Sequence, residues 1–211
     1  AGAGATWYRP TTLDGLLRLK AAHTAAKIVI GNTELEIERK FRGTAWEVLI
    51  TTTHVPELNV IRVLPDGVLV GASSTLVRVS TTLDRLIDTL PAERTYNYKA
   101  VVTQLKWFAG TQIRNVGAIA GNVANASPIS DLNPVLMASG ARVTLVRSTD
   151  GSTREMLVRD FFKERLYRQT QLQPDELIHS FVIPESRPLE YAEGYKVARR
   201  RDDDIAIVTA G

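Results

Sequence analysis

The chain has 211 residues, no cysteine and a formal net charge of +3, from 26 basic and 23 acidic side chains. Hydrophobic residues make up 44% and charged residues 23%, which is ordinary for a globular protein and excludes a disordered, collagen-like or disulfide-rich chain. The lack of thiols also excludes cysteine catalysis and an iron–sulfur cluster ligated by this chain. The three histidines show no metal-ligand spacing, so we expect no metal site.

The charge pattern and the hydropathy bear on the partners of the chain. Basic and acidic residues are mixed along most of the sequence. Nucleic-acid binding favours a stripe of unopposed basic residues with interleaved aromatics, which is not seen here. No apolar run approaches the length that spans a bilayer, and residues 1–6 lack the regions of a signal peptide. We expect no nucleic-acid partner, no membrane partner and a cytoplasmic location.

The first fifty residues predict a small α/β arrangement. A threonine-capped amphipathic helix is expected to end near His23, and the apolar run 27–30 predicts a buried strand. The polar turn Gly31–Glu34 follows and leads into a short helix. Residues 47–52 predict a second strand.

The remainder predicts a larger α+β arrangement, so we expect two domains, residues 1–53 and residues 54–211. Residues 111–130 show almost no helical or strand period, which indicates either a long functional loop or secondary structure that the pattern does not reveal. The chain stops inside its last expected strand, and we expect that it is cut from a longer polypeptide. The other expected elements are a hairpin of 60–63 and 68–72, helices over 81–90 and 98–109 with Gly110 after the second, a helix from its cap Asp131 to Ala138, a hairpin of 141–147 and 154–158, and strands over 176–183, 191–198 and 205–209.

The turn after the first strand is a candidate phosphate cradle. A glycine after a strand lets the backbone turn tightly and leaves successive N–H groups to face an anion. A helix that begins at Glu34 would direct its positive end the same way. An ordinary strand-to-helix turn has the same composition, and composition alone favours that interpretation.

The segment Gly117–Asp131 is a second candidate, because its small residues, backbone donors and carboxylate suit a nucleotide-contacting loop. A structural Ω-loop or a simple helix cap explains the same residues. Neither loop carries the G-x-G-x-x-G or the G-x-x-x-x-G-K-[ST] motif. The run Arg199–Asp204 is either a solvated turn or a charged loop beside a pocket. We predict no catalytic side chain, so a bound cofactor would do the chemistry.

Several motifs together resemble one family: IGNTE at 30–34, WFAG at 107–110, QIRNV at 112–116, GN at 121–122, ASPISDLNP at 126–134 and RRDDDIA at 200–206. From about Thr6 onward the sequence is similar to the FAD domain of eukaryotic-type xanthine dehydrogenase/oxidase, a molybdenum hydroxylase. The ASPISDLNP run is more similar to xanthine dehydrogenases than to aldehyde oxidases. The resemblance implies an α+β fold, the two-subdomain FAD-binding fold of molybdenum hydroxylase flavoproteins (vanillyl-alcohol-oxidase-like, PCMH-type).

The resemblance also implies a function. FAD would pass electrons from 2Fe-2S clusters to NAD⁺ or O₂, while hypoxanthine and xanthine are oxidised to urate at a molybdopterin centre. The implied partners are the iron–sulfur and molybdopterin domains of the same enzyme, NAD, and a second copy in a homodimeric parent. The alternatives are the FAD subunit of an aldehyde- or CO-oxidising molybdenum hydroxylase, a nucleotide-binding module without turnover, and, from the basic pI alone, a nucleic-acid-binding domain.

Cofactor contacts carried over from the family fall in several segments. Residues 31–34 would surround the pyrophosphate, Phe108 would pack on the adenine side and Ile178 would lie against the flavin. Lys196 would reach the cofactor from a late strand, and the loop 199–204 would bias the approach of NAD. The full implied set is Ile28, Val29, Ile30, Gly31, Asn32, Thr33, Glu34, Leu35, Phe108, Ala118, Ile119, Ala120, Gly121, Asn122, Asp131, Ile178 and Lys196.

The sequence departs from the pattern of that family at two positions. Ala120 stands where glycine is usual, and Ala118 stands where serine is frequent. The methyl group of Ala120 is harmless at a negative φ and costs about 1 kcal/mol at a positive φ. A missing hydroxyl at Ala118 would remove one hydrogen bond to the cofactor, so we expect weaker FAD binding than is usual in the family. The family's domain also continues past Gly211 into a further α+β subdomain.

Overall fold

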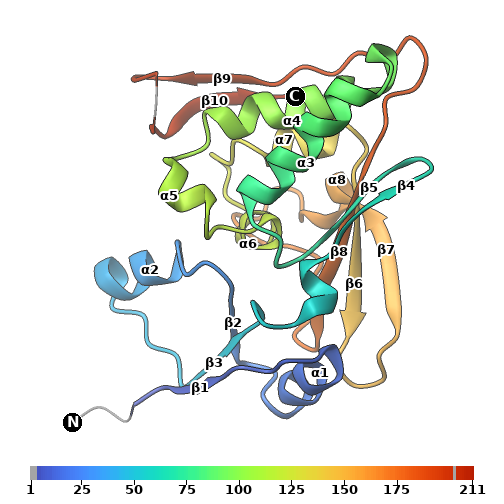
Figure 1. Ribbon diagram of the computed structural model, residues 1–211. Helices are drawn as coiled ribbons and strands as arrows, with labels where there is room; N and C mark the ends of the chain where they lie inside the picture. The colour runs from blue at the N-terminus through green and yellow to red at the C-terminus, as the bar shows by residue number, and fades with distance from the viewer. Residues whose placement is uncertain (1–3, 202) are drawn as a thin grey trace.

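The computed structural model describes residues 4–201 and 203–211 (Figure 1). The N-terminal sheet has three parallel strands in the order β1–β3–β2. Thr12 caps the first helix, because its Oγ1 accepts a hydrogen bond from the Gly15 N–H at 3.1 Å. Two predicted strands and two predicted helices of this region are confirmed: α1 (Leu13–Ala22), β2 (Lys27–Val29), α2 (Leu35–Arg42) and β3 (Val48–Thr51). The short strand β1 (Thr6–Tyr8) was not predicted from the sequence.

The central sheet has five antiparallel strands in the order β4–β5–β8–β6–β7. Both predicted hairpins are confirmed, and the late strand β8 pairs between them. Val68 lies opposite Ile183, and Val143 lies opposite Phe181, so the middle of the sheet is apolar and buried. The strands are β4 (Ile61–Leu64), β5 (Gly67–Gly71), β6 (Arg142–Arg147), β7 (Thr153–Leu157) and β8 (Glu176–Pro184), and the 3₁₀ turn η1 (Pro56–Asn59) precedes them.

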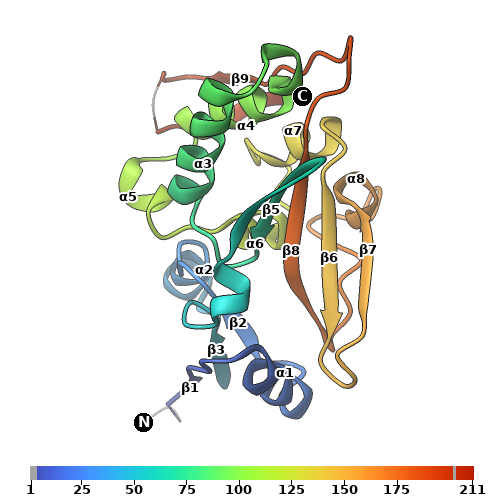
Figure 2. The same ribbon diagram turned by 45° about the vertical axis from the view of Figure 1, so that its right-hand side comes forward.

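Helices pack against one face of the central sheet, and two long ones, α3 and α4, lie side by side (Figure 2). Leu83 of α3 and Tyr98 of α4 belong to one continuous core that also includes Leu16 and Ile50 of the N-terminal region. In the described part of the chain, no helix is long and apolar enough to cross a membrane. The elements here are α3 (Leu76–Thr89), η2 (Ala92–Arg94), α4 (Tyr96–Lys106), α5 (Thr111–Arg114), α6 (Ile119–Asn125), α7 (Asn133–Ala138) and α8 (Val158–Phe161).

The expected helix boundaries in this layer were wrong at two places. Helix α3 begins at Leu76 rather than residue 81, because the Thr75 side chain caps it by accepting a hydrogen bond from the Arg78 N–H. Helix α4 ends at Lys106, and Gly110 is the N-cap of α5 instead of the residue that ends α4.

Of the two interpretations of residues 111–130, the long loop is wrong, since the segment contains α5 and α6. Helices of one or two turns built from Ala, Gly and Asn show no hydrophobic period, and packing on the core stabilises them. Asp131 does not cap α7. The Asn133 N–H donates to the Ser130 Oγ at 3.1 Å instead, and the N-cap residue is Leu132.

A C-terminal hairpin, β9 (Tyr195–Ala198) with β10 (Ala206–Ala210), forms a separate antiparallel sheet. It lies across the helical layer at the end of the molecule away from the N-terminal sheet (Figure 1). The first of these strands begins at Tyr195 rather than residue 191. The Thr209 hydroxyl donates to the Ser130 carbonyl at 3.2 Å and fastens the hairpin beside α7. The mixture of one parallel and two antiparallel sheets with helices confirms the α+β class.

Candidate functional site

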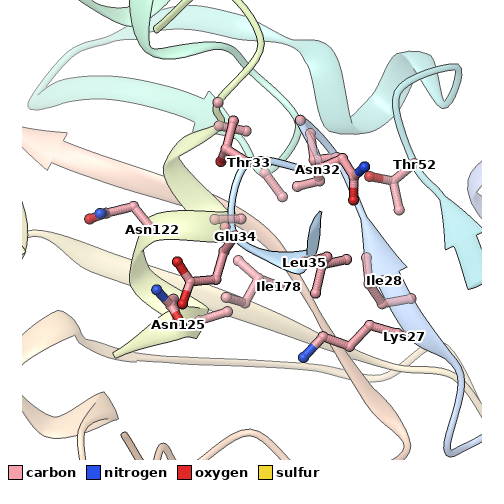
Figure 3. Close-up of a pocket in the computed structure, with 18 of the residues that line it drawn as sticks. Lys27, Ile28, Asn32, Thr33, Glu34, Leu35, Thr52, Asn122, Asn125 and Ile178 are labelled. Carbon is pink, nitrogen blue, oxygen red and sulfur yellow. The ribbon is translucent and has the colours of Figure 1, made fainter. Parts of the chain in front are cut away.

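A cavity of about 840 Å³ lies where the N-terminal sheet meets the helices and the central sheet (Figure 3). Its walls come from segments that are far apart in the sequence. The N-terminal region contributes the end of β2 and the turn into α2, and the larger region contributes Phe108, α6 and residues 168–178. The cavity is therefore a product of the tertiary fold.

The two loops singled out in the sequence touch each other at this cavity. A Cβ atom placed on Gly31 would lie 2.2 Å from the Val116 carbonyl oxygen, so only glycine allows this approach. Asn32 follows in the left-handed region, with φ of +57°. The other side of the contact is held by the Leu76 N–H, which donates to the Gly117 carbonyl at 2.9 Å.

The first loop presents a row of backbone donors. Within residues 4–201 and 203–211, no acceptor takes a hydrogen bond from the N–H groups of Asn32, Thr33, Glu34 or Leu35. These groups lie at the start of α2, and the N-terminal end of a helix carries partial positive charge. Successive free N–H groups at a helix start are suited to an anion such as a phosphate.

Helix α6 forms the opposite wall and contains both residues that depart from the family pattern. Ala120 lies inside the helix with ordinary helical backbone, so its methyl group is harmless there. Ala118 is the N-cap and makes no side-chain cap hydrogen bond, whereas a serine could make one. Gly121 lines the cavity, and a Cβ on it would meet no protein atom within 4 Å.

Most of the implied cofactor contacts line the cavity. Val29 and Ile119 are instead buried in the hydrophobic clusters beneath it, and Asp131 and Lys196 lie outside the lining. The lining members of the implied set are Ile28, Ile30, Gly31, Asn32, Thr33, Glu34, Leu35, Phe108, Ala118, Ala120, Gly121, Asn122 and Ile178.

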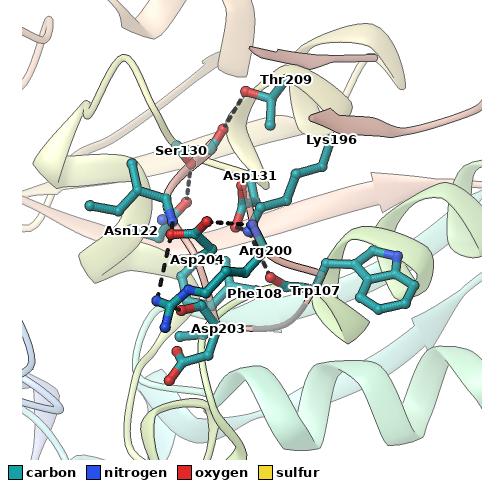
Figure 4. Close-up of polar contacts among 12 residues, drawn as sticks. Trp107, Phe108, Asn122, Ser130, Asp131, Lys196, Arg200, Asp203, Asp204 and Thr209 are labelled. Atoms are coloured by element: carbon teal, nitrogen blue, oxygen red, sulfur yellow. Dashed lines mark hydrogen bonds and ion pairs between the residues drawn. The ribbon is translucent and has the colours of Figure 1, made fainter. Parts of the chain in front are cut away.

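Asp131 and Lys196 form a nearly buried ion pair (Figure 4). Lys196 Nζ donates to Asp131 Oδ2 and to the Trp107 carbonyl, both at 2.8 Å. Burial raises the pKa of Asp131, and the Lys196 bond opposes that shift. Because Phe108 follows Trp107, this pair connects the C-terminal hairpin to the wall of the cavity.

The charged run between β9 and β10 folds back toward the same place. The Arg201 guanidinium carbon lies 5.5 Å from the centroid of the Trp107 ring. The Arg200 N–H donates to Asp204 Oδ2 at 2.8 Å (Figure 4). Asp202, which belongs to this run, lies outside the described residues.

Sequence reasoning missed four basic residues that line the cavity: Lys20, Lys27, Arg42 and Arg168. Lys20 is 6% exposed, and its Nζ donates to the Thr24 and Ala26 carbonyls at 2.6 and 3.4 Å. Burial lowers the pKa of Lys20. A lysine four residues after Leu16 on an apolar helix face was the available signal. Arg168 lies in a segment without a recognised motif, so nothing in the sequence around it indicated that it would line the cavity.

Comparison with known proteins agrees with this geometry. Residues 3–186 match the family model described as the FAD binding domain in molybdopterin dehydrogenase. The chain is 44% identical over 208 residues to xanthine dehydrogenase of Oryza sativa subsp. japonica. The aligned residues cover 99% of this chain and 15% of that protein. It is 44% identical over 210 residues to xanthine dehydrogenase/oxidase of Gallus gallus, with 100% and 15% coverage. The chain thus spans about 15% of the length of these relatives.

Solved structures share the fold at low sequence identity. Quinoline 2-oxidoreductase from Pseudomonas putida 86 superposes with a TM-score of 0.83 at 23% identity, covering 98% of this chain and 67% of that chain. CO dehydrogenase from Oligotropha carboxidovorans gives a TM-score of 0.81 at 23% identity, with 98% and 68% coverage. The fold that the sequence motifs implied is confirmed. The chain belongs to the FAD-binding domains of molybdopterin dehydrogenases, and its sequence is similar to those of xanthine dehydrogenases.

Proposed function

We propose that this chain binds FAD in the cavity of Figure 3 and serves as the electron-transfer domain of a xanthine dehydrogenase-like enzyme. The observation that carries the proposal is the meeting of two small-residue loops at one cavity, one of them with a row of free N–H groups. The cavity volume of about 840 Å³ lies within the usual range of ligand pockets, roughly 300–1,000 Å³. Gly121 leaves space for a dinucleotide at the wall formed by α6, while Gly31 lets the first loop contact the backbone at Val116.

The proposed contacts follow the walls of the cavity. The N–H groups of residues 32–35 take the pyrophosphate, and residues 118–122 support it from the opposite side. Phe108 packs on the adenine side and Ile178 lies against the flavin. Val29 and Ile119 act by packing from beneath. Residues 1–53 and 54–211 act as two subdomains that hold the cofactor between them.

Asp131 and Lys196 are proposed to act mainly by position. Their ion pair holds the Trp107 carbonyl, and through it the neighbouring Phe108, in the wall of the cavity. The loop between β9 and β10, which lies on Trp107, biases the approach of NAD.

FAD supplies the redox chemistry when bound, because a flavin can accept electrons from metal centres and exchange a hydride with a nicotinamide. The residues of this chain bind and orient it and exclude water, and none has to act as an acid or base. The names of the relatives support xanthine as a substrate of the parent enzyme, and the name of the family supports a molybdopterin partner domain. We propose that hypoxanthine and xanthine would be oxidised at that domain, that the FAD held by this chain would receive the electrons through 2Fe-2S clusters on another domain, and that NAD⁺ or O₂ would be the acceptor. We further propose a cytoplasmic, homodimeric parent enzyme.

A visible absorption spectrum tests this function. The purified chain is incubated with FAD, passed through a gel-filtration column, and then mixed with NADH without oxygen. We expect flavin bands that travel with the protein and bleach when NADH is added. Bands that stay unbleached would support FAD binding and contradict the NAD step, whereas a colourless protein fraction would contradict the FAD site itself.

A further inference from the structure

Arg168 reaches into the cavity from the loop between α8 and β8. Its Nη1 atom donates to Glu34 Oε1 at 2.9 Å and to Asn125 Oδ1 at 3.2 Å. Glu34 belongs to the first loop and Asn125 to α6, and Figure 3 shows both at the cavity. One guanidinium therefore bonds to both of the walls between which the proposed phosphate groups lie.

The backbone at Arg168 is unusual for a residue with a side chain. Its φ is +53°, in the left-handed region that favours glycine. The loop around it is closed by a bridge between Phe162 and Thr170 and by the Lys163 N–H, which donates to the Gln169 carbonyl at 3.0 Å. Strained positions of this kind persist where the surroundings demand them, and they concentrate at ligand sites.

Part of the Arg168 guanidinium makes no hydrogen bond within the described part of the chain. Both hydrogen bonds use Nη1, and in the described part of the chain no hydrogen bond uses Nε or Nη2. The Nε atom is buried, and a buried donor without an acceptor is destabilising. If the only task of Arg168 were to join Glu34 and Asn125, these donors would stay unpaired. The Nε and Nη2 hydrogens form the fork that matches two oxygens of a phosphate.

The charges around the cavity also favour an interaction between Arg168 and phosphate. A pyrophosphate near the first loop would lie close to the Glu34 carboxylate. The two anions would repel each other unless one cation interacts with both of them. Three other described cations line the cavity. Lys20 Nζ donates to two backbone carbonyls, Lys27 Nζ lies 4.0 Å from Glu38 Oε2, and Arg42 is exposed at the end of α2. Among the described cations that line the cavity, Arg168 is the one that is paired with Glu34.

We propose that Arg168 is an anion-binding residue: the free edge of its guanidinium takes phosphate oxygens of the dinucleotide, while Glu34 and Asn125 hold it in place. This inference rests on the proposed function in that it takes the ligand of the cavity to be a dinucleotide. It also gives the cavity a side-chain cation to accompany the backbone donors of residues 32–35, at a site where Ala118 supplies no hydroxyl.

The test compares ligands that carry phosphate with one that does not. Dissociation constants for FAD, ADP and adenosine are measured by equilibrium dialysis for the unchanged 211-residue chain, R168Q and R165Q. Arg165 is a matched control, because it lies in the same loop with φ of +59°, carries the same charge and does not line the cavity. We expect R168Q to weaken FAD and ADP by about 10- to 100-fold, the usual worth of a charge-assisted hydrogen bond, and adenosine by less than about 2-fold. R165Q should leave all three within about 2-fold.

Other outcomes separate this inference from the proposed function. If the unchanged chain binds FAD and R168Q binds it equally well, the Arg168 role is overturned and the FAD site stands. An equal loss for ADP and adenosine indicates a purely structural arginine and also overturns it. If ADP binds through Arg168 but FAD does not bind, the proposed function fails while the anion site stands. Binding of none of the three overturns both.

A second variant covers the case in which R168Q does not fold. R168K keeps the charge but not the fork, so its ADP affinity should lie between that of the unchanged chain and that of the glutamine variant. Inorganic pyrophosphate should raise the thermal midpoint of the unchanged chain more than that of R168K. Equal shifts would contradict the role of the guanidinium fork.

Discussion

Two glycines at the cavity do different work. Gly31 lets one loop contact another, since a Cβ atom there would lie 2.2 Å from the Val116 carbonyl oxygen. Gly121 contacts no other element in this way, because a Cβ there would stand in open space. The first glycine serves the protein fold, and the second leaves space for a ligand.

We expect Gly31→Ala to lower the free energy of unfolding by about 3 kcal/mol, because the backbone at Val116 must move to admit the methyl group. Flavin retention should be lost as well. Gly121→Ala is the matched comparison. It should raise the free energy of unfolding by about 0.5–1 kcal/mol, as alanine does inside a helix, and still weaken FAD binding. Urea unfolding and flavin titration measure the two effects, and an unchanged FAD affinity in Gly121→Ala would place the ligand elsewhere.

At the scale of the elements, β8 organises the molecule. It pairs with β5 on one side and β6 on the other, and it carries Ile178 to the cavity. Its first residue, Glu176, is 2% exposed and receives two hydrogen bonds from Arg154 at 2.7 Å and one from the Gln173 N–H at 3.0 Å. These bonds join β8, β7 and the turn that leads into the cavity wall.

We expect Glu176→Gln to lower the free energy of unfolding by about 2–3 kcal/mol at neutral pH. The Arg154 hydrogen bonds hold the pKa of Glu176 below its ordinary value in the folded state. The stabilisation is therefore complete above the unfolded pKa of about 4.3 and is lost as the pH falls through the folded pKa. The difference between the two proteins should shrink in acid. Urea unfolding over a pH series measures it.

Glu155 provides the control for this prediction. It also pairs with an arginine, Arg142, at 3.0 Å, but its side chain is 48% exposed. Glu155→Gln should therefore change the free energy of unfolding by less than about 1 kcal/mol. Equal effects of the two substitutions would contradict the special position of Glu176.

At the scale of the whole molecule, the cavity depends on the relative placement of the N-terminal sheet, the helices and the C-terminal hairpin. The hairpin is fastened by the Lys196–Asp131 pair and by the Thr209 hydroxyl. The same lysine holds the carbonyl that precedes Phe108. The position of the hairpin is thereby linked to the cavity wall.

We expect Lys196→Met to lower the free energy of unfolding by about 3–5 kcal/mol, because Asp131 is left buried without its partner. Limited proteolysis should then cut within residues 195–210. Burial already raises the pKa of Asp131, and removal of Lys196 raises it further. The folded variant then binds a proton more tightly than the unfolded chain, so its deficit should shrink as the pH falls. Lys106→Met, at an exposed lysine of α4, should have little effect, and a comparable loss there would contradict this account.

Local chemistry was enough to predict much of the fold. The capped helix α1, the strand before the Gly31 turn and both hairpins follow from capping residues, apolar periods and turn residues within a few positions of each other. Family motifs led to the α+β fold and to the segments that line the cavity. In these segments, the identity of the residue and its local conformation carry the information.

Only the tertiary structure decided the rest. Helices α5 and α6 are too short to show a period, so packing makes them helical. The insertion of β8 between two hairpins, the buried Lys196–Asp131 pair and the reach of Arg168 to Glu34 join residues far apart in the chain. No local pattern encodes such contacts, because their energy arises only when desolvated partners meet in the folded core.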